Sequence, residues 1–159
     1  MKTAILYASS RGTTEKAAQL LMTKLNGQVS LINLKKEKTI DLADFDAVIL
    51  GSSIHAGMVQ GKMKNFITAN ENELLLKKLG LFICCMYEGE KADEQLQTAY
   101  PEQLQQHSVV NAVFGGEFDF KKMNFVEKFI IKKMSGSTEN VSTLSEEKIF
   151  EFATAFNEV

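Results

Sequence analysis

A turn rich in hydroxyl side chains occupies residues 9–14, which read SSRGTT. Serine and threonine hydroxyls, an arginine guanidinium and the free N–H groups at a helix start are donors that proteins offer to phosphate. One hydroxyl would suffice to cap a helix, so this density of hydroxyls next to a glycine exceeds that need. The turn therefore predicts a phosphate site made by Ser9, Ser10, Arg11, Gly12, Thr13 and Thr14.

A buried strand and a helix are expected to hold this turn from its two sides. Residues 3–8 form an apolar run without helical spacing, which is typical of a strand buried on both faces of a parallel sheet. Ala17, Leu21 and Leu25 then fall at helical spacing, so a helix should begin near residue 13 or 14. The turn lacks GxxxxGK[ST] and GxGxxG, which excludes the nucleoside-triphosphate loop and the dinucleotide fingerprint.

Further strands and helices are expected to alternate along the chain. Apolar runs predict strands at 28–34, 47–50, 81–86 and 109–114. Helical spacing predicts helices at 63–79, with a break near 70–72, at 91–100, and at 146–156 with Ser145 as the N-cap. This alternation is typical of an α/β fold in which helices cover both faces of a doubly wound parallel sheet.

The loops at one edge of such a sheet should form the ligand site. Ligands of doubly wound sheets bind beyond the carboxyl ends of the strands, where the strand order reverses. The loops after the first, third, fourth and fifth predicted strands lie there, at residues 9–14, 52–58, 87–91 and 115–120.

Length and composition favour one domain over residues 1–159. A net charge of -2 and a pI of about 5.8 argue against a nucleic-acid surface. No apolar run reaches membrane-spanning length and the start lacks a signal-peptide pattern, so a cytoplasmic location is expected. The adjacent Cys84 and Cys85 are expected to be buried thiols, and neither His55 nor His107 has a partner at metal-ligand spacing.

The turn at residues 9–14 resembles the T-x-T-G-N-T-like loop that flavodoxins place around the phosphate of FMN. It matches that loop at Ser9, Gly12 and Thr14, whereas Arg11 replaces a threonine and Thr13 replaces an asparagine. The resemblance implies a flavodoxin-like fold of five strands in the order 2-1-3-4-5, with FMN as the cofactor.

The same resemblance implies which loops hold the flavin ring. Tyr87 could stack on the ring, or it could pack at a strand end with its hydroxyl in water. His55 could donate to the flavin or to a substrate, or it could be a solvent-exposed loop residue. The full set of implied ring contacts is Ser52, Ser53, Ile54, His55, Ala56, Gly57, Met86, Tyr87, Glu88, Gly89 and Gly116.

A narrower resemblance covers nearly the whole chain. Residues 51–57 (GSSIHAG), the pair Gly115–Gly116 and residues 129–136 (FIIKKMSG) are similar to the menaquinone-dependent protoporphyrinogen dehydrogenases. That family has a G-A-S-I-R-Y-G loop and a basic insert ending in K-M-S-G-G, but His55 and Ala56 stand here in place of its Arg and Tyr. The resemblance implies an insert at about 117–137.

The insert leaves its own role open. A basic, amphipathic helix over 123–134 could contact an anionic membrane surface or a lipophilic partner, or its apolar stripe could cover the protein's own sheet. The resemblance thus implies an FMN-binding, flavodoxin-like oxidoreductase, with a quinone- or porphyrinogen-linked dehydrogenase as the enzyme hypothesis. The alternatives are a single-domain electron carrier between redox partner proteins and a module that has lost FMN. No catalytic residue and no metal ligand is predicted.

Overall fold

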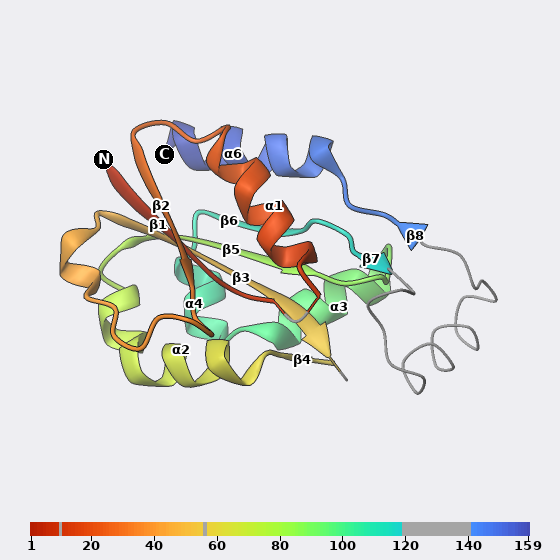
Figure 1. The fold of residues 1–159 in the computed structure, drawn as a ribbon, viewed down its shortest axis with the longest axis horizontal. Helices are drawn as coiled ribbons and strands as arrows, with labels where there is room; N and C mark the ends of the chain where they lie inside the picture. The colour runs from red at the N-terminus through yellow and green to blue at the C-terminus, as the bar shows by residue number, and fades with distance from the viewer. Residues whose placement is uncertain (10, 56, 119–140) are drawn as a thin grey trace.

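The structure is a computed structural model, and it describes residues 1–9, 11–55, 57–118 and 141–159. Its central sheet has the strand order β2-β1-β3-β5-β6, and neighbours along this path are parallel (Figure 1). Counted without the short strand β4, this is the predicted order 2-1-3-4-5, which is therefore confirmed. The strands are β1 (Lys2–Ala8), β2 (Gln28–Asn33), β3 (Ala47–His55), β5 (Lys78–Cys84) and β6 (Val110–Val113).

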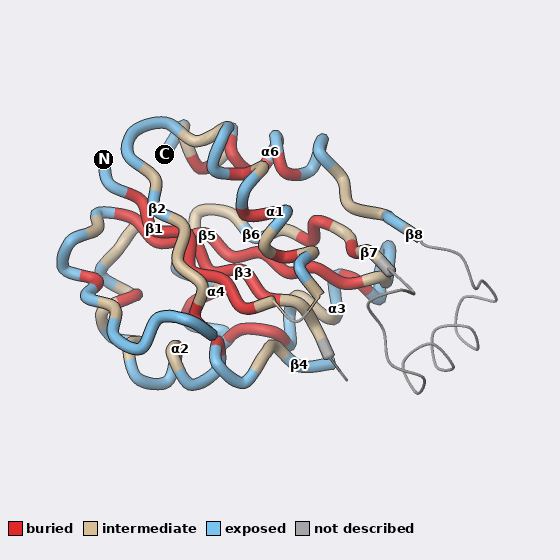
Figure 2. Tube along the Cα trace, in the orientation of Figure 1, coloured by how far each residue is buried: buried red, intermediate tan, exposed pale blue. Residues whose placement is uncertain are grey.

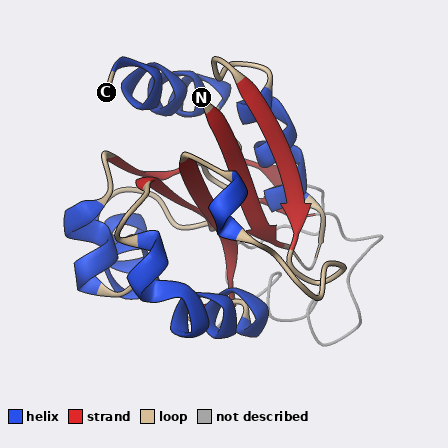
Figure 3. Cartoon of the chain, turned by 90° about the vertical axis from the view of Figure 1, so that its left-hand side faces the viewer, coloured by secondary structure: helices blue, strands red, loops and turns tan. Residues whose placement is uncertain are grey.

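Helices cover both faces of this sheet, as predicted (Figure 3). One face carries α1 (Thr13–Met22) and α6 (Glu146–Glu158), and Ser145 caps α6 by accepting a hydrogen bond from the N–H of Lys148. The opposite face carries α2 (Gly61–Leu74), α3 (Glu90–Ala99), α4 (Glu102–His107) and the short 3-10 helix η1 (Leu42–Asp44).

Two hydrophobic cores lie between the sheet and its two helical layers. Successive strand side chains point to opposite faces, so Ile5 packs with α1 and α6 whereas Leu6 packs with α2 and α3. Figure 2 shows that the buried residues follow the central strands and the inner sides of the helices. The core under α1 and α6 is rich in aromatic rings. Phe82 stacks on Phe114 at 4.6 Å between ring centroids, and Phe152 meets Phe114 edge-on at 5.3 Å.

The strand register brings the predicted site loops to one edge of the sheet. Ala8 of β1 pairs with Ser52 of β3, and Ser53 pairs with Cys84 of β5. The residues that follow β1, lie at the end of β3 and follow β5 therefore meet at the carboxyl edge. This is the position that the doubly wound arrangement predicts for a ligand.

Three elements differ from the sequence-based predictions. The helix predicted over 63–79 ends at Leu74 without a break at 70–72, and β5 begins at Lys78 rather than at residue 81. Leu79 extends the apolar spacing of the helix, but it is fully buried in the sheet, and this burial prevails over the local pattern. The third strand continues to His55 rather than ending before Gly51.

The extension of β3 replaces part of a predicted loop. It pairs antiparallel with β4 (Met58–Val59), and Gly57 lies in the turn between them with φ at +76°. A second short ribbon joins β7 (Glu117–Phe118) to β8 (Val141–Ser142), and no pattern predicted it. The predicted helix over 123–134 lies outside the described residues.

Candidate functional site

The turn after β1 is held open by a glycine in the left-handed region. Gly12 is the N-cap of α1 with φ at +88°, and its N–H donates to Ser9 Oγ at 2.9 Å. Among the described residues no side chain caps α1, so the positive end of its dipole lies in the turn, and the acidic residue of its first turn is Glu15. A Cβ placed on Gly12 would have no atom within 4 Å, so the backbone here faces open space.

The side chain of Thr14 is a second indication that the turn can bind a ligand. Its Oγ1 is buried and has no hydrogen-bond partner. Buried hydroxyls are nearly always paired, so an unpaired one next to an uncapped helix start fits a site for an anion with acceptor oxygens. A phosphate group has that chemistry, and the residues of the turn fit it.

The Thr14 hydroxyl packs against the thiol of Cys84 at the end of β5. Burial raises the pKa of Cys84 to about 12, and the neighbouring Thr14 hydroxyl offsets only part of that rise. Apart from this contact, the Thr14 oxygen has no hydrogen-bond partner among the described residues. Cys84 and Cys85 are both free and buried, which confirms that part of the prediction.

An exposed ion pair connects α1 to the β7–β8 ribbon. Lys16 Nζ lies 2.8 Å from Glu117 Oε1, and Ser142 Oγ donates to the same oxygen at 3.1 Å. The Lys16 side chain is 58% exposed, so the pair contributes little free energy of folding but fixes where the ribbon begins. The ribbon therefore starts one helical turn from the candidate phosphate site.

The serines at the end of β3 are already paired within the protein. Ser52 is fully buried, and its Oγ accepts from the Gln60 N–H at 3.1 Å and donates to the Ser53 carbonyl at 3.0 Å. Ser53 Oγ accepts from Gln60 Nε2 at 2.9 Å. These hydroxyls thus join the β3–β4 hairpin to the start of α2, a role for Gln60 that sequence reasoning missed.

The segment after β5 combines an exposed aromatic ring with acidic neighbours. Tyr87 is 38% exposed, and Lys91 Nζ lies over its ring at 5.4 Å from the centroid. The thiol of Cys85 donates to the Tyr87 carbonyl at 3.8 Å, which helps to hold this segment. Met86 is half-buried, whereas Glu88 and Gly89 are exposed.

Gly116 has a packing role in the structure. A Cβ at this position would lie 2.9 Å from Met86 Sδ and 3.0 Å from the Cys85 backbone. The Gly116 N–H donates to Thr143 Oγ1 at 3.1 Å, and the Thr143 N–H donates to the Gly116 carbonyl at 2.7 Å. Gly116 thus lets the chain after β6 pass close under the segment that follows β5.

The structure brings most of the predicted residues to one edge and leaves some without description. Ser10 and Ala56 lie outside the described residues, and of His55 only the backbone, at the end of β3, is described. Ile54 is partly buried and packs against the α2 and α3 core. The roles of the individual residues in binding a cofactor stay predictions.

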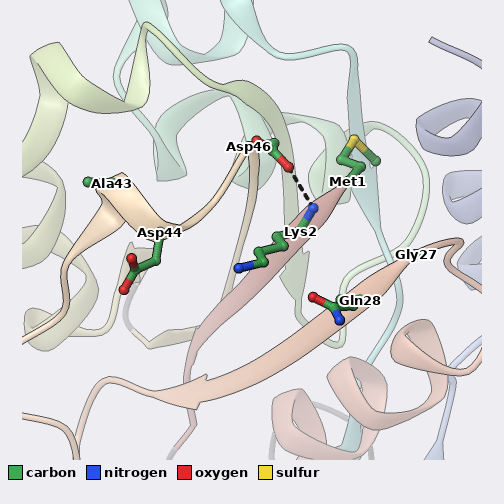
Figure 4. A pocket seen from close by; sticks show the side chains of 7 residues that line it. All are labelled: Met1, Lys2, Gly27, Gln28, Ala43, Asp44 and Asp46. Carbon is green, nitrogen blue, oxygen red and sulfur yellow. Dashed lines mark hydrogen bonds between the residues drawn. The ribbon is translucent and has the colours of Figure 1, made fainter.

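A separate open pocket lies at the opposite edge of the sheet (Figure 4). It has a volume of about 610 Å³, and the Lys2 N–H donates to Asp46 Oδ2 at 2.7 Å within it. Because Lys2 and Gln28 begin β1 and β2, this pocket is at the amino ends of the strands, away from the turn at 9–14. Its lining residues are Met1, Lys2, Gly27, Gln28, Ala43, Asp44 and Asp46.

A family model for the flavodoxin domain matches residues 4–145. The chain therefore belongs to the flavodoxin domain family, the class of protein that the fold and the turn after β1 define. A search of curated protein sequences found no match. Among the described residues, no helix is long and apolar enough to cross a membrane.

Solved structures give the same fold at low sequence identity. Flavodoxin 1 from Bacillus cereus superposes with a TM-score of 0.64 and 17% identity, over 99% of this chain and 98% of that one. A Fusobacterium nucleatum flavodoxin bound to flavin mononucleotide gives 0.54 and 18%, over 71% and 69%. Rubredoxin oxygen:oxidoreductase from Desulfovibrio gigas gives 0.57 and 18%, but the chain, covered over 98%, spans only 36% of that protein.

Proposed function

We propose that this protein binds FMN at the carboxyl edge of its sheet and exchanges electrons with a redox partner protein. When bound, FMN would supply the redox chemistry, since the flavin itself takes up and releases electrons. The family and the flavodoxins of the same fold support this cofactor. The chain's own contribution is to bind and orient the flavin and to limit access to it.

The observation that carries the proposal is the uncapped helix start in the turn after β1. The first N–H groups of α1 have no side-chain cap, the Thr14 hydroxyl is buried without a partner among the described residues, and the backbone at Gly12 leaves open space in front of them. A phosphate monoester supplies acceptor oxygens and a negative charge at the positive end of the helix dipole. Residues 9–14 would therefore hold the FMN phosphate.

The β3–β4 hairpin and Tyr87 would border the flavin ring. Tyr87 offers an exposed aromatic ring at the same edge, and Gly57 has no side chain at its position in the hairpin turn. Replacing Tyr87 with Ala should weaken FMN and riboflavin equally, by about 1 kcal/mol each, because the ring is common to both ligands. Equal affinity of the variant and the wild type for both ligands would remove Tyr87 from the site.

Comparison of FMN with riboflavin tests the proposal directly. Purified protein, stripped of any flavin, is titrated with each ligand while flavin fluorescence is recorded. The phosphate should tighten binding at least roughly tenfold, the scale of two charge-assisted hydrogen bonds. Equal affinity for FMN and riboflavin would contradict the assignment of residues 9–14.

A quinone- or porphyrinogen-linked oxidoreductase is a second candidate. The observation that favours it is the β7–β8 ribbon, which Lys16 and Ser142 attach beside the candidate phosphate site. Part of the resemblance to protoporphyrinogen dehydrogenases, residues 129–136, falls between these two strands in the sequence. Turnover of protoporphyrinogen with menaquinone distinguishes an enzyme from a carrier, and binding to anionic vesicles at low salt tests the predicted membrane contact.

A further inference from the structure

A buried amide oxygen lies between the β3–β4 hairpin and α3, and none of the described residues pairs with it. Gln95 is on the second turn of α3, and its Oε1 is buried without a hydrogen-bond partner. A Cβ placed on Gly57 would lie 3.9 Å from this oxygen, so Oε1 sits at the turn of the hairpin. The sequence predicts a helix here, and no pattern in it selects this residue.

The side-chain oxygen of Gln95 is enclosed by neighbouring elements, so leaving it without a hydrogen bond costs free energy. α3 packs against β4, so the amide is enclosed by elements rather than placed on a free helix face. Buried side-chain oxygens without a donor are uncommon in native proteins, and each one calls for an explanation such as a ligand. Gln60, which precedes α2 on the same hairpin, has its amide nitrogen paired with Ser53 at 2.9 Å.

The missing group is therefore a hydrogen-bond donor that arrives between the hairpin and α3. The candidate ring site has the same two borders, since α3 follows Tyr87 and the hairpin contains Gly57. The isoalloxazine ring carries one N–H donor in its oxidised form, at N3, between two carbonyl oxygens. An amide oxygen is a suitable acceptor for that group.

We propose that Gln95 is a specificity residue of the flavin site and that its Oε1 accepts the N3–H of the ring. This inference rests on the proposed function, because it requires that a flavin binds at this edge. It assigns the pyrimidine end of the ring to the space between the hairpin and α3. The phosphate end then lies at residues 9–14, on the other side of β3 in the sheet order.

Gln95→Leu provides the first test, because the variant removes the orphan oxygen and keeps similar bulk. The apo protein should unfold at an equal or higher urea concentration, since a buried unpaired acceptor is lost. Affinity for FMN should fall roughly tenfold, and affinity for riboflavin should fall by the same factor. The matched control is Gln97→Leu, on the exposed side of α3, which should leave both affinities unchanged.

Methylation of the ligand provides the second test. The wild type should bind 3-methyl-FMN roughly tenfold more weakly than FMN, and Gln95→Leu should bind the two with similar affinity. Equal discrimination by the wild type and the variant would overturn the assignment of N3–H to Gln95, as would unchanged FMN affinity in Gln95→Leu. Failure of the wild type to bind any flavin would overturn the proposed function and this inference together.

Discussion

The two hydroxyl-rich segments at the carboxyl edge differ in whether their buried hydroxyl group is paired. In the turn after β1, Thr14 Oγ1 is buried without a partner and no side chain caps α1. At the end of β3, the hydroxyls of Ser52 and Ser53 form hydrogen bonds with Gln60, and that of Ser52 also bonds to the backbone. Residue types alone therefore do not distinguish a hydroxyl-rich segment that binds a ligand from one that stabilises the fold.

The difference has a physical origin in what surrounds each segment. The turn after β1 leads into a helix whose first N–H groups need acceptors, and Gly12 keeps side chains away from them. The end of β3 enters a hairpin, whose backbone groups pair with β4. Function is thus expected from the segment that is left incomplete, and stability from the one that is complete.

The largest expected effect is on the free energy of unfolding, and it comes from Cys84, which is buried beside Thr14 in the turn after β1. The Cys84 thiol below Thr14 has its pKa raised from 9.0 to about 12 by burial. Between these values the unfolded state loses a proton that the folded state keeps, so the free energy of unfolding should decrease as pH rises. The decrease is about 1.4 kcal/mol per pH unit, or up to about 4 kcal/mol in total.

Urea unfolding at pH 8, 9.5 and 10.5 measures this decrease. Cys84→Ala should lessen the slope, and Cys85→Ala should lessen it by a smaller amount, since Cys85 is less enclosed. Alkylation of Cys84 in the folded protein at pH 9 at the rate of the unfolded chain would contradict the burial of this thiol.

Gly12→Val is expected to break the first segment as a ligand site. Its φ of +88° strains any β-branched residue, and the added side chain would enter the open space in front of α1. FMN affinity should fall at least thirtyfold, or about 2 kcal/mol, as measured by fluorescence titration.

Gly61→Val is the matched control for that substitution. Gly61 also has no atom within 4 Å of an added Cβ, but its φ is not in the left-handed region and it lies at the start of α2. This variant should bind FMN like the wild type. A similar loss in both variants would assign the effect to general damage.

Ser52→Ala should affect folding rather than binding. The substitution leaves the Gln60 N–H without its acceptor, so the free energy of unfolding should decrease by about 1.5 kcal/mol. FMN affinity should change less than about twofold. Ser30→Ala, at an exposed position of β2, should be nearly neutral in the same urea experiment.

Thr14→Val should show the reverse of that pattern, with the smallest effect. The apo protein should keep its stability, because the lost hydroxyl has no partner, while FMN affinity falls about fivefold, or 1 kcal/mol. Riboflavin affinity should be unaffected. Thr98→Val, on the exposed side of α3, controls for the loss of a hydroxyl. An equal effect of the two substitutions on FMN affinity would contradict a binding role for the Thr14 hydroxyl.

The fold could be predicted from the sequence because its strands are unbroken apolar runs. Residues 3–8 and 47–50 are buried in central parallel strands, where alternation is not required, whereas β6 at the edge of the sheet leaves Asn111 exposed. The boundary between α2 and β5 could not be predicted, because Leu74 and Leu79 belong to one apolar spacing and only tertiary burial separates them. The extension of β3 depends on pairing with β4, which local composition does not indicate.

The candidate site could be predicted as a place more readily than as a set of contacts. The turn at 9–14 is local, so its hydroxyl density was visible, and the FMN expectation is supported by the family. Gln60 and Gln95 act through distant partners, and a glutamine on a helix gives no signal of that. The resemblance to protoporphyrinogen dehydrogenases goes beyond the family found and stays a proposal.

The β7–β8 ribbon marks a position where the length of the chain can change without altering the rest of the fold. Phe118 pairs with Val141, so the two residues that flank positions 119–140 in the sequence lie side by side. Residues added or removed between these two strands leave the ends of β6 and α6 where they are, and the entropy of closing a longer loop grows only slowly with length. A change in the length of this loop should therefore leave the sheet and the turn after β1 unchanged.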